Sequence, residues 1–119
     1  MGDSILKIKS YEFALLVIQV VSKLQKEQKE YILSRQIMRS GTAIGALIRE
    51  AEFAQSKVDF IHKMSIALKE ANETFYWISL LKDSHYIDND VFVSMNTNCN
   101  ELIALLVSIV KTSKKNLNS

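Results

Sequence analysis

The stretch from residue 58 to residue 78, VDFIHKMSIALKEANETFYWI, decides the fold class of this chain. Its apolar side chains recur at alternating intervals of three and four residues, which is the spacing of one helix face, whereas a strand would need a period of two. A helix of about 27 residues around this stretch would be roughly 40 Å long and could not cover its own apolar stripe. Partner helices are therefore required. The predicted stripe is Ile61, Met64, Leu68, Ala71, Phe75 and Ile78, flanked by Phe60, Ala67 and Leu81.

The composition favours a single all-helical domain. The chain has 119 residues, of which 48% are hydrophobic, with no proline and only three glycines. The single cysteine, Cys99, excludes an intramolecular disulfide and fits a reducing compartment, and the sequence indicates no secretory signal. The longest apolar run, Phe13 to Val21, is shorter than the ~20 residues that cross a bilayer. We therefore predict a soluble, cytoplasmic protein.

Outward from the central stretch, the same periodicity predicts three more helices. Short connections between amphipathic helices favour an all-α, antiparallel up-down-up-down four-helix bundle, and we treat residues 1–119 as one domain. A polar leader precedes the first helix, and a polar, basic tail follows the last. The predicted helices span about residues 10–28, 34–53, 57–83 and 89–112, and the tail spans residues 113–119.

Three polar residues are predicted to cap helices by accepting hydrogen bonds from backbone N–H groups of the first turn. Ser34 would begin the second helix, and Asp88 would begin the fourth. Ser56 would begin the third, with Asp59 three residues later completing a pattern like a capping box. The predicted apolar stripe of the fourth helix is Phe92, Met95, Cys99, Leu102, Leu106 and Ile109.

The first helix is apolar nearly all round, because eight of the nine residues from Phe13 to Val21 are apolar. Such a helix implies burial on two sides, by its own bundle and by another molecule. An ordinary core helix with scattered exposed leucines is the alternative. The predicted bundle face is Tyr11, Ala14, Ile18 and Val21, with Phe13, Val17, Val20 and Leu24 beside it and Leu15 and Leu16 elsewhere.

Two glycines, Gly41 and Gly45, interrupt the second helix within a run of small residues. Each costs about 1 kcal/mol relative to alanine inside a helix. That cost indicates close approach of another backbone at these positions. A flexible break in the helix is the competing interpretation.

Three segments together resemble a known family. They are residues 31–51 (YILSRQIMRSGTAIGALIREA), 57–60 (KVDF) and 65–74 (SIALKEANET). The order and spacing of these motifs are similar to those of the four-helix-bundle proteins encoded in intervening sequences of bacterial 23S ribosomal RNA genes. The resemblance extends over about residues 10–110.

The resemblance implies a four-helix bundle that assembles into a ring of five and has no enzymatic activity. The chain is also similar to the accessory protein of diversity-generating retroelements, which implies binding to nucleic acid and to a reverse transcriptase. Two segments depart from the family pattern. Leu47 and Arg49-Glu50-Ala51 stand where Asn and Ala-Glu-Gly are commoner, and Ser84-His85-Tyr86-Ile87 replaces Gly-Tyr-Ile. The resemblance therefore supports the fold more strongly than the function.

No combination of residues in the sequence is typical of catalysis. His62 and His85 fall on different elements, and we interpret His62 as a surface or half-buried side chain. Cys99 sits at a stripe position, where a lone cysteine acts as a small hydrophobe. Asp59 and His62 form an Asp-x-x-His pair that occurs once, and the Glu-x-x-His signature of di-iron bundles is missing. We therefore predict a protein that is not an enzyme and uses no cofactor or metal.

Basic residues gather near predicted helix ends and indicate contact with RNA or DNA. A ring would repeat these charges, and affinity for phosphates rises steeply with the number of charges engaged. The alternative is that they are solvated helix ends paired with nearby glutamates, and Arg39 in particular is placed to pair with Glu50 or Glu70. The predicted nucleic-acid contacts are Lys23, Lys26, Lys29, Arg35 and Arg39 at one pole and Lys111, Lys114 and Lys115 at the other.

Apolar residues outside the core stripes predict a subunit interface, where aromatic side chains concentrate. We therefore expect a homo-oligomer. The alternative function is an interaction module that docks on a partner protein without nucleic acid. The predicted interface residues are Leu15, Leu16, Tyr76, Trp77 and Leu80.

Overall fold

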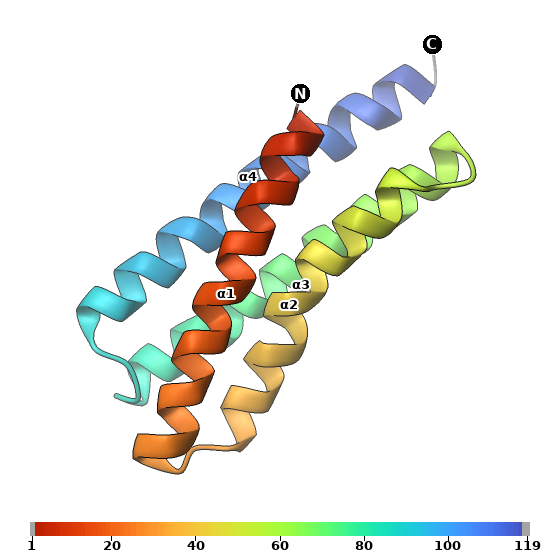
Figure 1. Ribbon diagram of the computed structural model, residues 1–119. Helices are drawn as coiled ribbons and strands as arrows, with labels where there is room; N and C mark the ends of the chain where they lie inside the picture. The colour runs from red at the N-terminus through yellow and green to blue at the C-terminus, as the bar shows by residue number, and fades with distance from the viewer. Residues whose placement is uncertain (1, 118–119) are drawn as a thin grey trace.

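The computed structural model describes residues 2–117, with side chains from residue 5 onward. Four helices run through it: α1 (Gly2–Gln28), α2 (Ile32–Glu52), α3 (Lys57–Asp83) and α4 (Asn89–Leu117). Successive helices alternate in direction, and each packs on its two neighbours in the order α1, α2, α3, α4 (Figure 1). The predicted all-α, up-down-up-down four-helix bundle is confirmed. α1 and α3 lie diagonally opposite each other, as do α2 and α4.

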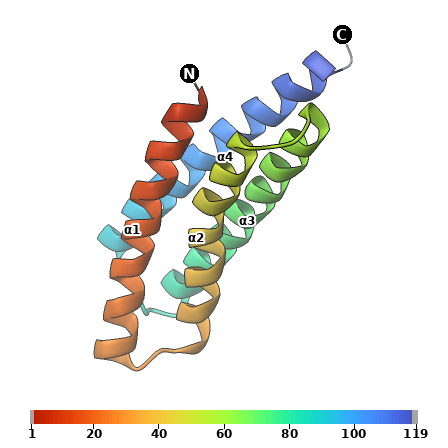
Figure 2. The same ribbon diagram turned by 45° about the vertical axis from the view of Figure 1, so that its right-hand side comes forward.

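The bundle is a rod with extents of 51 × 21 × 20 Å, and its two ends differ in what they contain. At one end lie the α1–α2 turn and the α3–α4 turn, and we call this end the turn pole. At the other end α1 begins, α4 ends and the α2–α3 turn crosses over, and we call it the terminal pole (Figures 1 and 2).

The core stripe of α3 differs from the predicted one. Thr74 is buried, whereas Phe75 keeps 38% of its surface exposed, so the prediction of Phe75 as a core residue is wrong. Thr74 fits because its hydroxyl lies 2.8 Å from that of Ser40 and bonds the Glu70 carbonyl oxygen at 2.8 Å, which satisfies a buried polar group. The buried residues of α3 are Ile61, Met64, Ala67, Ala71, Thr74, Ile78 and Leu81.

The buried face of α1 is also displaced from the predicted one. Tyr11 and Ile18 are exposed, so their assignment to the bundle face is wrong. The residues predicted to lie beside that face form the core instead. The buried apolar residues of α1 are Leu6, Phe13, Val17, Val20, Val21 and Leu24.

Both terminal helices are longer than predicted. α1 begins at Gly2 rather than near residue 10, because Leu6 is fully buried and Lys7 forms an ion pair with Glu52 of α2 at 2.8 Å. The predicted polar leader is therefore wrong. α4 continues to Leu117, so most of the predicted tail is helical. Residues 118 and 119 of that tail lie outside the described residues.

Two of the three predicted caps are confirmed. The Ser56 hydroxyl accepts from the Asp59 N–H at 3.0 Å, and the Asp88 carboxylate accepts from the Val91 N–H at 2.9 Å. Ser34 is not a cap, since α2 begins two residues earlier. The Glu30 carboxylate takes that role, accepting from the N–H groups of residues 32, 33 and 34 at 3.2, 3.0 and 2.7 Å.

Close approach of α1 at the two glycines of α2 is confirmed, and α2 is continuous through them, which excludes a flexible break. A Cβ added at Gly41 would lie 2.9 Å from Val17 Cγ2, and one added at Gly45 would lie 3.3 Å from Ser10 Oγ. The small residues therefore set the distance between α1 and α2.

α4 passes a test of length and hydropathy for membrane-spanning helices. Its apolar side chains nevertheless form a core stripe: Met95, Cys99, Leu102 and Leu106 are buried within the bundle. The core helix of a soluble protein can give the same signal, so this one helix is weak evidence for a membrane.

Candidate functional site

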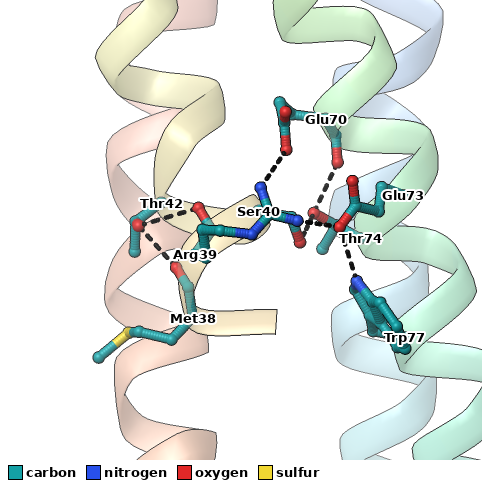
Figure 3. Close-up of polar contacts among 8 residues, drawn as sticks. All are labelled: Met38, Arg39, Ser40, Thr42, Glu70, Glu73, Thr74 and Trp77. Atoms are coloured by element: carbon teal, nitrogen blue, oxygen red, sulfur yellow. Dashed lines mark hydrogen bonds and ion pairs between the residues drawn. The ribbon is translucent and has the colours of Figure 1, made fainter. Parts of the chain in front are cut away.

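Arg39 joins α2 to α3 through two carboxylates (Figure 3). Its Nη1 lies 3.2 Å from Glu70 Oε1, and its Nη2 contacts Glu73 Oε2. The same Glu73 oxygen accepts from Trp77 Nε1 at 3.0 Å. Glu50, the other suggested partner of Arg39, instead binds Lys63 at 3.1 Å. Pairing of Arg39 with Glu70 is therefore confirmed, and the guanidinium is committed to the bundle although half of it is exposed.

The predicted basic residues of the turn pole lie among acidic ones. Lys23, Lys26 and Lys29 are exposed, and the Arg35 guanidinium lies 5.9 Å from the centre of the Tyr31 ring. Residues 23–35 and 82–90, which form this pole, contain five basic and five acidic side chains. The turn pole is therefore close to neutral.

The terminal pole is strongly basic by comparison. Residues 2–9, 49–63 and 108–117, which form it, contain eight basic and four acidic side chains. Lys7 and Lys63 are neutralised by Glu52 and Glu50. Within the described residues, four cations of this pole have no carboxylate within ion-pair distance: Arg49, Lys57, Lys111 and Lys114.

The lysines at the end of α4 lie on adjacent turns. Lys111, Lys114 and Lys115 are three and four residues apart, so they share one side of the helix. The negative end of the helix dipole stabilises cations there. Sequence reasoning placed these three lysines at a pole but did not distinguish the charge of the two poles.

α1 carries a second apolar stripe on the side away from the core. Ile8, Tyr11, Leu15 and Ile18 follow intervals of three, four and three residues and expose 59%, 56%, 46% and 43% of their surfaces. At 100° per residue, this stripe points opposite to the buried residues. Of its members only Leu15 was predicted at an interface. Reading α1 as two stripes instead of one wide face would have found the others.

The remaining interface candidates differ in exposure. Tyr76 of α3 exposes 56% of its surface and packs edge-on against Trp77, with ring centroids 5.1 Å apart. Trp77, Leu80 and Leu16 are half-buried. Because α1 and α3 are diagonal in the bundle, Leu15 and Tyr76 lie on opposite sides of the molecule.

The two histidines lie at opposite ends of the bundle. His62 lies near the terminal pole and His85 in the turn that follows α3, and both are exposed. Burial raises the pKa of the Cys99 thiol to about 12, which leaves it protonated and unreactive. Within residues 2–117, no three His, Cys, Asp or Glu side chains lie close enough together to hold a metal ion.

Comparisons with known proteins agree with this architecture. Residues 3–108 match the 23S rRNA-intervening sequence protein family. The chain is similar to a crystal structure of a protein with unknown function from the S23 ribosomal protein family of Bacteroides thetaiotaomicron VPI-5482. That likeness has 52% identity and a TM-score of 0.91, over 93% of this chain and 99% of that one. Among curated protein sequences no match was found. Neither description names an enzymatic activity.

Proposed function

Because this chain belongs to the 23S rRNA-intervening sequence protein family, matched over residues 3–108, we propose that it is a non-enzymatic subunit of a cytoplasmic homo-oligomeric ring that binds RNA or DNA at its terminal pole. The observation that carries this proposal is the uncompensated positive charge of that pole. That pole contains eight basic and four acidic side chains, whereas the turn pole contains five of each.

The exposed apolar surfaces support assembly into a ring. The stripe of α1 and the Tyr76 side of α3 lie on different sides of the bundle, so one copy's α1 would pack on the next copy's α3. Such a head-to-tail contact closes into a ring when the rotation between copies divides a full turn, and the family resemblance implies five copies.

A ring would convert a modest charge into a strong phosphate-binding surface. Copies related by rotation about an axis along the bundles present every terminal pole on the same rim. Each additional neutralised phosphate adds to the affinity through counterion release, so the repeated lysines act together on one strand.

The assembly is tested by light scattering at micromolar concentration. We expect the wild-type protein to be oligomeric and Leu15→Glu to be monomeric, because the charge would be buried at the contact. Val107→Glu is the matched control, since Val107 has the same 46% exposure but lies on α4, which the proposed contact does not use. A monomeric wild-type protein would overturn the assembly.

Nucleic-acid binding is tested by charge reversal at the two poles. We expect Lys111→Glu, Lys114→Glu and Lys115→Glu together to abolish salt-dependent binding of RNA and DNA oligonucleotides. The matched triple variant, Lys23→Glu, Lys26→Glu and Lys29→Glu, should retain most of it. Equal loss in both triple variants would show that the poles do not differ. A purified protein that carries a stoichiometric protein partner and no nucleic acid would favour the interaction-module alternative.

A further inference from the structure

Phe53 is exposed to an extent that the monomer does not explain. It ends α2, and 81% of its surface is accessible, the largest fraction among the large apolar side chains of the described residues. Its backbone is fixed, because the Phe53 N–H donates to the Glu50 carbonyl oxygen at 3.1 Å. The bundle does not need an aromatic side chain here, because a small polar residue would end the helix equally well and the Phe53 ring is mostly exposed.

Phe53 borders a shallow groove lined by two acidic and two basic side chains. Glu50 binds Lys63 at 3.1 Å, and Asp59 accepts from the Gln55 N–H at 3.1 Å. Arg49, which also lines the groove, has no carboxylate within ion-pair distance among the described residues. The groove is therefore neutral in sum, with Phe53 and the unpaired Arg49 on its lining, and the excess positive charge lies in the rest of the terminal pole.

We propose that Phe53 stacks on an unpaired base of a single-stranded nucleic acid, while Arg49 and the terminal-pole lysines neutralise its phosphates. This inference rests on the proposed function and specifies its partner. Binding sites for single strands combine a positively charged surface with aromatic side chains on which bases stack, and the terminal pole around this groove supplies the positive charge. A duplex offers no open base faces along its length. The core of a protein–protein interface is depleted in charged residues, which this groove is not.

The test measures fluorescence anisotropy of a labelled oligouridine with the full chain and its variants. Phe53→Ala should weaken binding about fivefold or more, which is the effect of losing one stacked base. Phe53→Leu should weaken it equally because it keeps apolar bulk without a π face, and Phe53→Tyr should retain binding. Ile32→Ala is the control, since Ile32 is 76% exposed but lies at the turn pole.

The salt dependence separates stacking from charge. Phe53→Ala should leave the slope of log affinity against log salt unchanged, whereas Arg49→Gln should reduce it by about 0.7 if it loses one phosphate contact. The wild-type protein should also bind the single strand more tightly than an RNA duplex of equal length. Phe53→Ala should lose that preference.

The possible failures are distinguishable. A wild-type protein that binds no nucleic acid overturns both this inference and the proposed function. Salt-dependent binding of undiminished affinity in Phe53→Ala, or a wild-type protein with no preference for single strands, overturns only the stacking role. If Phe53→Leu retained binding while Phe53→Ala lost it, Phe53 would make an apolar contact without stacking, which also overturns the stacking role. If light scattering found a changed subunit number in Phe53→Ala, the Phe53 side chain would belong to a contact between copies, and this result would also overturn the inference.

Discussion

Replacing Gly41 by alanine should destabilise the protein even though alanine is the better helix former. The added Cβ would lie 2.9 Å from Val17 Cγ2, closer than packed carbon atoms approach. Val17 is fully buried and β-branched, so its χ1 rotamer in the helix is nearly fixed and it cannot turn away. Overpacking of this kind costs about 1–3 kcal/mol, against about 1 kcal/mol gained in helix propensity. We expect a net loss of about 1 kcal/mol.

Gly45→Ala is the internal control for that magnitude. Its added Cβ would lie 3.3 Å from Ser10 Oγ, a contact that a small shift of the serine relieves. The helix-propensity gain is the same in both variants, so it cancels when they are compared. We therefore expect Gly45→Ala to be neutral or stabilising by up to about 1 kcal/mol, and more stable than Gly41→Ala by about 1–3 kcal/mol.

The assay is urea unfolding followed by circular dichroism at one fixed protein concentration, because stability of an oligomer depends on concentration. Val17→Ala completes a double-mutant cycle. The methyl group that Gly41→Ala adds occupies space that Val17→Ala vacates, so the double variant should be more stable than additivity predicts by at least about 0.5 kcal/mol. Equal stabilisation by Gly41→Ala and Gly45→Ala, with additive behaviour in the cycle, would refute the close approach of α1 at Gly41.

Three further predictions follow from single contacts. Arg39→Ala should cost about 1 kcal/mol or less, because the ion pairs are partly exposed, and should shift the emission of Trp77, the only tryptophan, without changing the salt slope of nucleic-acid binding. His85 has φ 64° in the turn that ends α3, so His85→Gly should stabilise by about 1 kcal/mol in thermal unfolding, whereas Ser84→Gly, at φ −88°, should not. Burial raises the pKa of the Cys99 thiol from 9.0 to about 12, and the folded state therefore holds this proton more tightly. The contribution of the Cys99 thiol to the free energy of unfolding is complete below pH 9.0. It is lost by about 1.4 kcal/mol per pH unit as pH rises towards about 12. The stability difference between wild type and Cys99→Ala should therefore shrink over that range.

Local patterns in the sequence predicted the elements of this fold well. The three-and-four spacing in residues 58–78 predicted a long helix, and α3 has the predicted bounds. Ser56 and Asp88 marked helix starts because their side chains bond backbone groups only three residues away. The paired glycines indicated either a close helix contact, which would offset their cost inside a helix, or a flexible break, and the structure shows the contact. Each of these signals acts within one or two helical turns.

The candidate site could be predicted only in part. Sequence reasoning named the lysines at the end of α4, but it gave equal weight to those at the end of α1. It named Leu15 and Tyr76, but it assigned Tyr11 and Ile18 to the core side of α1 and gave no role to Phe53. Several apolar faces of α1 satisfy a helical period, and periodicity does not say which of them meets α2 and α4.

The sequence by itself thus determined that the chain forms amphipathic helices, where three of them begin or end, and that they pack as a bundle, because helical periodicity and capping depend on neighbours along the chain. Only the tertiary structure decided that Thr74 replaces Phe75 in the core, that Arg39 is held by Glu70 and Glu73, and that the uncompensated charge gathers at one pole. These outcomes depend on distances between atoms more than 30 residues apart in the chain, such as the 34 residues that separate Ser40 from Thr74. Helix packing sets those distances, and they in turn decide which charges neutralise each other and which remain for a partner.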